Sequence, residues 1–190
     1  MWNGSAWVLL STGTANPPAM EMIMGIGCSA GGTASNGVVT VGSTVSVVTV
    51  TDAFSSSYDN YRIVMYGSQS SSGTDLRFAL GNSATGSAYY GSYYYDAYTG
   101  GGTGTARQSN ATFAYIGGIA STNNEQSLSF DIFRPQLAQR TSLHGQAYGN
   151  GYSFWFSFTN ASTTQFTSFS ISNTGGTITG GTIRVYGYRN

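Results

Sequence analysis

Apolar and polar residues alternate with a period of two along most of this 190-residue chain. No window of useful length shows the 3.6-residue period of an amphipathic helix. In SLSFDIF, for example, Leu128, Phe130 and Ile132 share one face, and Ser129 and Asp131 take the other. A strand with one buried and one solvated face has this pattern, so the alternation predicts half-buried β-strands.

The same alternation recurs in short segments bounded by Gly, Asn, Ser or Thr clusters that favour turns. Strands are expected in 61–67, 75–81, 112–118, 127–133, 142–149, 152–158, 166–172 and 182–190. The β-branched segment 38–50 predicts one long strand or a bent pair that breaks at Gly42. Roughly nine or ten short strands without helices between them indicate an all-β fold, an antiparallel β-sandwich. A jelly roll is the expected form, and another Greek-key sandwich is the alternative.

The first 37 residues differ from the rest of the chain. Segment 25–37, GIGCSAGGTASNG, has few bulky residues and is interpreted as a loop or linker. The short apolar stretch before it contains Glu21, which excludes a membrane span there. We therefore expect a short N-terminal hairpin and linker over 1–37, and the sandwich domain over 38–190.

Two tryptophans mark this N-terminal segment. Trp2 and Trp7 flank an Asn3-Gly4 pair, which a tight hairpin turn favours. So small a unit cannot bury two indole rings by itself. Trp2 and Trp7 must therefore pack on the sandwich or on a neighbouring chain.

Charged residues make up only 7% of the chain, and seven Lys and Arg balance seven Asp and Glu. All seven cations are arginines, and they are scattered singly, whereas a nucleic-acid binder needs clustered cations. We therefore expect no nucleic-acid partner. With 40% hydrophobic and 14% aromatic residues the chain has too much apolar surface to be disordered. A zero net charge also leaves no self-repulsion to oppose dense self-association.

The residues that usually carry catalysis are scarce. One cysteine, Cys28, excludes an internal disulfide, and one histidine, His144, excludes a multi-histidine metal site. The alternation of SLHGQAYG places His144 on the solvent face or rim. Residues 27–31, GCSAG, match G-x-S-x-G, but GGTASNG follows Ser29 where a nucleophile elbow needs a helix. We therefore expect no catalytic residues, no cofactor, no metal and no enzymatic activity.

A polysaccharide depolymerase is the less favoured enzymatic alternative. Glycoside hydrolysis needs two carboxylates within reach of one sugar. Asp59, Asp75 and Asp96 are the candidates, and we place all three in loops.

One tryptophan stands on a face that should be polar. In YSFWFSF, Trp155 lies among serines, opposite the face that carries Phe154, Phe156 and Phe158. A large aromatic side chain there can anchor a subunit interface, which we favour, or can stack on a sugar ring.

Residues 88–98, AYYGSYYYDAY, hold six of the 14 tyrosines and precede a glycine run. A strand here would place tyrosines on both of its faces. Tyrosine mixed with Gly, Ser and Asp is typical of antibody paratopes, so the stretch predicts an aromatic-rich recognition loop. Burial under its own loops or against a neighbouring subunit is the alternative. The candidate ligand-binding residues are Tyr90, Tyr93, Tyr94, Tyr95, Asp96, Tyr98 and Trp155, and the candidate subunit-interface residues are Trp2, Trp7 and Trp155.

Three phrases resemble small bacteriophage virion proteins. AFSSSYDNYRIVMYG (53–67) and GGTITGGTIRVYGYRN (175–190) look like the opening and closing strands of tail-fibre and head-fibre tip domains. WNGSAWVLLSTG (2–13) resembles a segment that often precedes such a domain. The resemblance implies a β-sandwich that assembles as a homotrimer on a phage particle and contacts the host surface, commonly a glycan. It implies no catalytic residues, and it makes 1–37 a trimer contact or attachment segment.

We therefore expect a homotrimeric virion fibre or spike tip that binds a host-surface glycan or protein receptor and touches other virion proteins. It would insert into no membrane, assemble in the host cytoplasm and act in the extracellular virion. No Lys or Arg precedes Arg62, so no ordinary signal peptide is expected. The alternative is a structural capsid or tail decoration or connector protein, whose exposed aromatics only hold subunits together.

Overall fold

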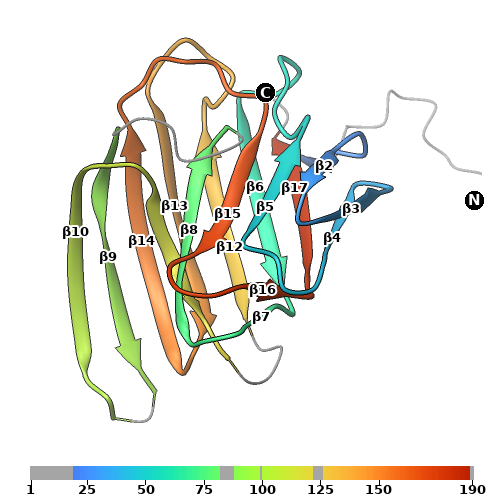
Figure 1. The fold of residues 1–190 in the computed structure, drawn as a ribbon. Helices are drawn as coiled ribbons and strands as arrows, with labels where there is room; N and C mark the ends of the chain where they lie inside the picture. Colours follow the sequence, from blue (N-terminus) through green and yellow to red (C-terminus); the bar gives the residue numbers. More distant parts are fainter. Residues whose placement is uncertain (1–18, 82–87, 99, 122–125, 189–190) are drawn as a thin grey trace, which may run out of the picture.

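The computed structural model describes residues 19–81, 88–98, 100–121 and 126–188. Within these residues two antiparallel β-sheets pack face to face (Figure 1). The expected all-β antiparallel sandwich is therefore confirmed.

The larger sheet has ten strands in its described part. They are β1 (Met20–Met22), β3 (Gly32–Ser35), β4 (Val38–Val41), β6 (Asn60–Tyr66), β9 (Tyr89–Ala97), β10 (Thr103–Ala111), β12 (Ser127–Phe133), β13 (Thr141–Gly149), β14 (Tyr152–Asn160) and β17 (Thr182–Tyr188). Their order is β10-β9-β14-β13-β12-β6-β17-β4-β3, and β1 pairs with β17. Strands β9 and β14, which carry most of the candidate ligand-binding residues, are therefore neighbours in this sheet.

The smaller sheet covers one face of the larger one. Its strands are β2 (Gly27–Ala30), β5 (Val47–Thr51), β8 (Thr74–Leu80), β11 (Ala114–Ile119) and β15 (Phe169–Asn173), in the order β11-β8-β15-β5-β2. A separate ribbon pairs β7 (Gln69–Ser70) with β16 (Ile178–Thr179).

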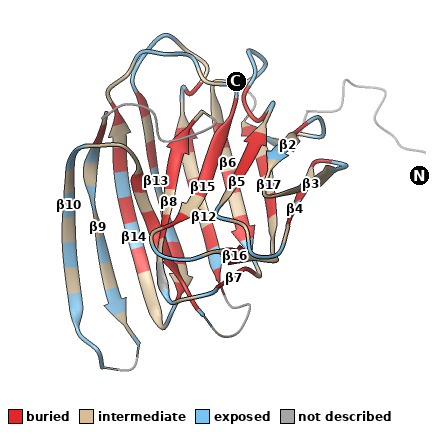
Figure 2. Cartoon of the chain, viewed as in Figure 1, coloured by how far each residue is buried: buried red, intermediate tan, exposed pale blue. Residues whose placement is uncertain are grey.

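The core lies between the sheets, where the predicted inward faces meet (Figure 2). Phe78 of β8 packs edge-to-face on Phe130 of β12, with ring centroids 5.3 Å apart. Leu128 and Ile132 are also buried, whereas Asp131 is only partly buried. The alternation in SLSFDIF thus predicted the two faces of β12 correctly, because burying this apolar side drives the packing.

The larger sheet is wider than the smaller one. Edge strand β11 packs on β13 and β14 and only touches β9, so β9 and β10 extend past the edge of the smaller sheet (Figure 1). The inner face of β9 is therefore only partly covered.

The break predicted at Gly42 is confirmed, because β4 and β5 lie in different sheets.

The loop or linker predicted over 25–37 is wrong. β2 pairs with β5 in the smaller sheet, and β3 pairs with β4 in the larger sheet. Strand β1 of the larger sheet already begins at Met20. The small residues permit close backbone contact: a Cβ on Gly31 would lie 2.1 Å from the carbonyl oxygen of Val47. The predicted hairpin with Trp2 and Trp7 lies outside the described residues.

The tyrosine stretch is also not a loop. Residues 89–97 form strand β9, which pairs with β14 on one side and β10 on the other. Gly91 does not interrupt the strand. A Cβ there would lie 2.2 Å from the carbonyl oxygen of Ser157, so glycine allows β9 to approach β14 closely.

Candidate functional site

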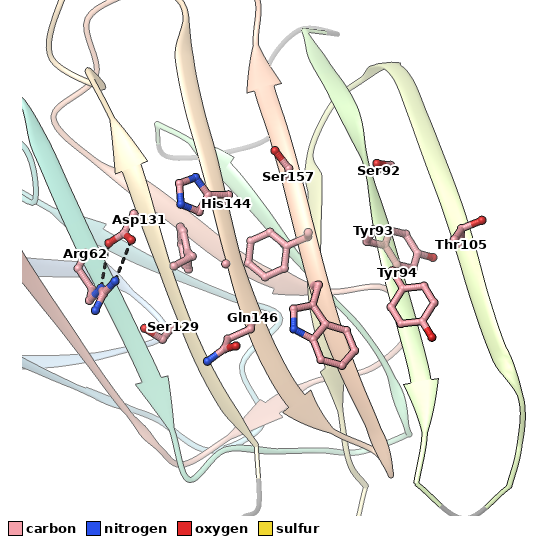
Figure 3. Close-up of a pocket in the computed structure, with 14 residues that line it drawn as sticks. Arg62, Ser92, Tyr93, Tyr94, Thr105, Ser129, Asp131, His144, Gln146 and Ser157 are labelled. Carbon is pink, nitrogen blue, oxygen red and sulfur yellow. Dashed lines mark hydrogen bonds and ion pairs between the residues drawn. The ribbon is translucent and has the colours of Figure 1, made fainter.

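The outer face of the larger sheet, opposite the core, is hollowed between β6 and β10. The depression has a volume of about 670 Å³ and is open to solvent. Outward side chains of β6, β12, β13, β14, β9 and β10, which are adjacent strands in this order, surround it (Figure 3). Those side chains are Arg62, Ser92, Tyr94, Thr105, Ser129, Asp131, His144, Gln146, Trp155 and Ser157.

Strand register places two exposed aromatic side chains next to each other in this depression. Trp155 of β14 lies opposite Tyr94 of β9, with ring centroids 5.5 Å apart and ring planes inclined by 39°. Trp155 is 46% exposed and Tyr94 is 38% exposed. The prediction that Trp155 stands on an outer polar face is confirmed, and its neighbour comes from the tyrosine stretch.

Polar side chains continue the same cross-strand row on both sides of this aromatic pair. Gln146 of β13 lies opposite Trp155, and Thr105 of β10 lies opposite Tyr94. Ser129 of β12 follows beyond Gln146. The row thus offers amide and hydroxyl groups within one or two strand spacings of the rings.

An ion pair borders the depression at β6 and β12. The Arg62 guanidinium donates from Nε to Asp131 Oδ1 at 2.9 Å and from Nη2 to Oδ2 at 2.8 Å. The Tyr188 hydroxyl also donates to Oδ1. Partial burial opposes ionisation of Asp131, but these hydrogen bonds and the Arg62 charge outweigh it and lower the pKa of the carboxyl. Partial burial and the bond to Asp131 in turn raise the pKa of Tyr188 to about 12.

His144 lies beside this ion pair on β13, opposite Asp131. Its imidazole is exposed and stacks on the Phe133 ring, with centroids 5.1 Å apart and planes inclined by 23°. The predicted position on the solvent face is confirmed. The stacking holds the ring at the edge of the depression. The side chain that carries both ring nitrogens is exposed there.

The remaining candidate ligand-binding residues are dispersed. Tyr90 and Asp96 are exposed on the outer face of β9 but do not line the depression, and the Tyr90 hydroxyl donates to Asn110 Oδ1 at 3.0 Å. Tyr98, 68% exposed, lies beyond the end of β9, with its ring centroid 6.2 Å from that of Tyr148. The structure therefore does not gather the predicted residues into one site.

Tyr93 and Tyr95 point to the inner side of the sheet. Together with Tyr152 and Phe154 they line a smaller cavity of about 240 Å³ that also contains Asp75. Burial raises the pKa of the Asp75 carboxyl, and the Arg77 charge only partly offsets this. These tyrosines were predicted to read a receptor from a loop, but they pack beside the core.

The acids proposed for glycoside hydrolysis are also placed differently. Asp75 lies in β8 and Asp96 in β9, so the prediction that both occupy loops is wrong. Asp96 projects from the outer face, whereas Asp75 lines the inner cavity. The larger sheet separates them, so they cannot flank one sugar.

Of the ten outward residues that line the depression, sequence reasoning named only Tyr94 and Trp155 as binding candidates, and those it missed include Arg62, Asp131 and Gln146. The alternation in 127–133 and 142–149 already placed Asp131 and Gln146 on outward faces. What the sequence does not contain is the order β9-β14-β13-β12-β6, which brings these residues beside Trp155.

Two further properties hold for the part of the chain that the structure describes. No three His, Cys, Asp or Glu side chains gather closely enough to hold a metal ion. No helix there is long and apolar enough to cross a membrane.

Comparisons with known proteins leave the family open. No family model and no curated protein matches the chain. A solved structure described as peanut lectin with a nine-residue peptide is similar over 85% of this chain and 94% of that chain, at 11% identity and a TM-score of 0.24. A similarity this low carries no argument about function.

Proposed function

We propose that this protein is the tip domain of a homotrimeric bacteriophage fibre or spike, and that it binds a host-surface glycan in the outer depression. The observation that carries the proposal is the pair formed by Trp155 and Tyr94. Both rings are substantially exposed, lie side by side, and are surrounded by hydroxyl and amide groups.

This arrangement suits a sugar chemically. The C–H face of a pyranose ring packs against an indole or phenol ring, while its hydroxyls need nearby donors and acceptors. Gln146, Ser157 and Thr105 supply such groups beside the rings. The volume of about 670 Å³ falls in the range of roughly 300–1,000 Å³ that ligand sites usually have. Because the depression is open, a ligand longer than one ring could also enter it.

A binding role fits the depression better than hydrolysis does. Among the described residues that line it, Asp131 is the only carboxylic acid, and Arg62 and Tyr188 already hold it in the ionised form. Glycoside hydrolysis uses a pair of acids on either side of the scissile bond. We therefore assign Asp131 to the organisation of the surface rather than to proton transfer.

The test is binding of purified protein to a glycan array and to host cells. Trp155→Ala and Tyr94→Ala should each weaken binding by about tenfold, because each removes stacking worth roughly 1–2 kcal/mol. Tyr98→Ala is the matched control, since it removes an exposed ring outside the depression. No binding to any host fraction by intact trimers would exclude the proposal.

The structural decoration or connector role is the second candidate. Its support is that an exposed aromatic pair in a sheet with little charge would also serve as a subunit contact. In that case Trp155→Ala would dissociate the oligomer. Size-exclusion chromatography with light scattering on this variant separates the two roles.

A further inference from the structure

We propose that the glycan is acidic, and that it lies across the strands so that its carboxylates contact Arg62 at one end of the depression and, outside the depression, Arg107 of β10, which lies opposite Ser92. This inference rests on the proposed function, because it specifies the ligand of the same outer face.

Register places the two arginines in one cross-strand row. Ladder partners connect Arg62 of β6 to Asp131, Asp131 to His144, His144 to Ser157, Ser157 to Ser92 and Ser92 to Arg107 of β10. This row spans six adjacent strands. Its two ends are therefore five strand spacings of about 4.8 Å apart, or roughly 24 Å. That distance exceeds one sugar ring and requires an oligosaccharide.

The aromatic pair lies beside this row, between the two arginines. Trp155 and Ser157 are both outward residues of β14, and Tyr94 and Ser92 are both outward residues of β9. A chain that runs from Arg62 to Arg107 therefore passes next to the rings, where one of its sugars can stack. Ser157, Ser92 and His144 border the same path and can hydrogen-bond to its hydroxyls.

The charge of the outer face favours an anion. From β17 to β10 the outward positions carry three arginines, Arg184, Arg62 and Arg107, and two acids, Asp131 and Asp96. The excess is therefore one positive charge (3 − 2), in a chain whose formal net charge is zero.

Asp131 orients the Arg62 guanidinium so that it can bind a second carboxylate. Asp131 fixes its Nε and Nη2, while the side chain stays 39% exposed. No hydrogen bond within the described part of the chain uses Nη1, so this nitrogen keeps its donors for a ligand. A guanidinium that one carboxylate already orients binds a second one with little further loss of conformational freedom.

Arg107 supplies the second contact. It is an exposed outward residue of edge strand β10, and no salt bridge in the described part of the chain involves it. Its cross-strand neighbour is Ser92, so no acidic side chain lies directly opposite it. Its charge is therefore available to a ligand that reaches the edge of the sheet.

The experiment compares uronic-acid and sialic-acid oligosaccharides with the same oligosaccharides after their carboxyl groups have been reduced to alcohols. Each pair keeps the sugar rings and loses only the charge. We expect the acidic forms to bind at least about tenfold more tightly at low salt, and this preference should shrink as ionic strength rises.

Two variants locate the contacts. Arg62→Gln and Arg107→Gln should each weaken binding of the acidic forms by about fivefold and should weaken binding of the reduced forms much less, because a hydrogen bond to an alcohol is weaker than one to a carboxylate. Arg140→Gln is the matched control, because Arg140 is exposed but lies outside both the depression and the cross-strand row from Arg62 to Arg107. Thermal unfolding of each variant checks that it is folded. Arg107 makes no ion pair in the described part of the chain, so its variant remains informative if Arg62→Gln unfolds.

The outcomes are distinguishable. Equal binding of acidic and reduced forms, still weakened by Trp155→Ala, would overturn the acidic ligand and leave the glycan-binding proposal in place. An acidic preference that Arg62→Gln and Arg107→Gln both leave unchanged would also overturn this inference. Absence of binding to either form by intact trimers would exclude both proposals.

Discussion

Tyr89 shows that the tyrosines of the 88–98 stretch do not share one role. It is only 2% exposed, and its hydroxyl accepts a hydrogen bond from the Leu80 backbone N–H at 2.7 Å. Burial raises the pKa of Tyr89 to about 12, while the bonds from Leu80 and Asn160 act in the opposite direction. Tyr89 therefore anchors the start of β9 to the smaller sheet, whereas Tyr94 lies on the outer face.

Replacing Tyr89 by phenylalanine should destabilise the fold by roughly 1–3 kcal/mol at neutral pH, because the Leu80 N–H loses its buried partner. The pKa of about 12 exceeds the ordinary value of 10.0, so the contribution of Tyr89 is complete below pH 10 and is lost as the pH rises toward 12. Urea unfolding at several pH values measures both effects. Tyr98→Phe is the control, and an unchanged alkaline pH dependence in Tyr89→Phe would contradict the assignment.

The pair formed by Arg62 and Asp131 makes the opposite prediction in acid. The pKa of Asp131 lies below its ordinary value, so its contribution is complete above about pH 4 and is lost as the pH falls through the lowered pKa. Arg62→Gln should lower stability by about 0.5–1 kcal/mol at pH 7, because solvent partly screens this partly exposed pair. The difference from the unsubstituted protein should vanish in strong acid. Urea unfolding between pH 7 and pH 2 tests this, and a loss independent of pH would refute it.

Among the elements, β9 owes its place to Gly91. Because a Cβ at this position would lie 2.2 Å from a backbone oxygen of β14, Gly91→Ala must push the strands apart. We expect a loss of roughly 1–3 kcal/mol and a weakened glycan site, since Trp155 and Tyr94 lie across the same strand pair. Gly25→Ala is the matched control, because no atom lies within 4 Å of the added Cβ. Denaturant unfolding of both variants measures the difference, and equal stabilities would rule out this account of Gly91.

Local patterns predicted most strands because burial of one face depends on neighbours two residues away. SLSFDIF and YSFWFSF gave the correct inward faces, and Gly42 marked a real change of sheet. In both wrong predictions, at 25–37 and 88–98, composition was taken to indicate a loop. A lack of bulky residues in 25–37 and a paratope-like composition in 88–98 were each interpreted as a loop, whereas Gly31 and Gly91 are needed where backbones from distant parts of the sequence approach closely.

For the whole molecule, the site depends on sheet order. Trp155 could be placed outward from its own strand, but its contact with Tyr94 requires β9 to pair with β14, which no local pattern specifies. The different widths of the two sheets likewise decide that Tyr93 and Tyr95 face a cavity beside the core. The outer face could thus be predicted residue by residue, but not as one surface.

The proposed trimer predicts one role for Trp2 and Trp7 and a different role for Trp155. Burial of an indole ring in an interface is worth several kcal/mol, at about 25 cal/mol per Å² of apolar surface, so removing two should dissociate the trimer. We expect the double variant Trp2→Ser, Trp7→Ser to be monomeric by light scattering, with the circular dichroism spectrum of a β-sandwich, because the described strands lie within 20–188. Trp155→Ala should remain trimeric and bind the glycan about tenfold more weakly. The reverse pattern would make Trp155 the interface anchor, and the outer depression would then be covered by a neighbouring subunit and closed to a glycan.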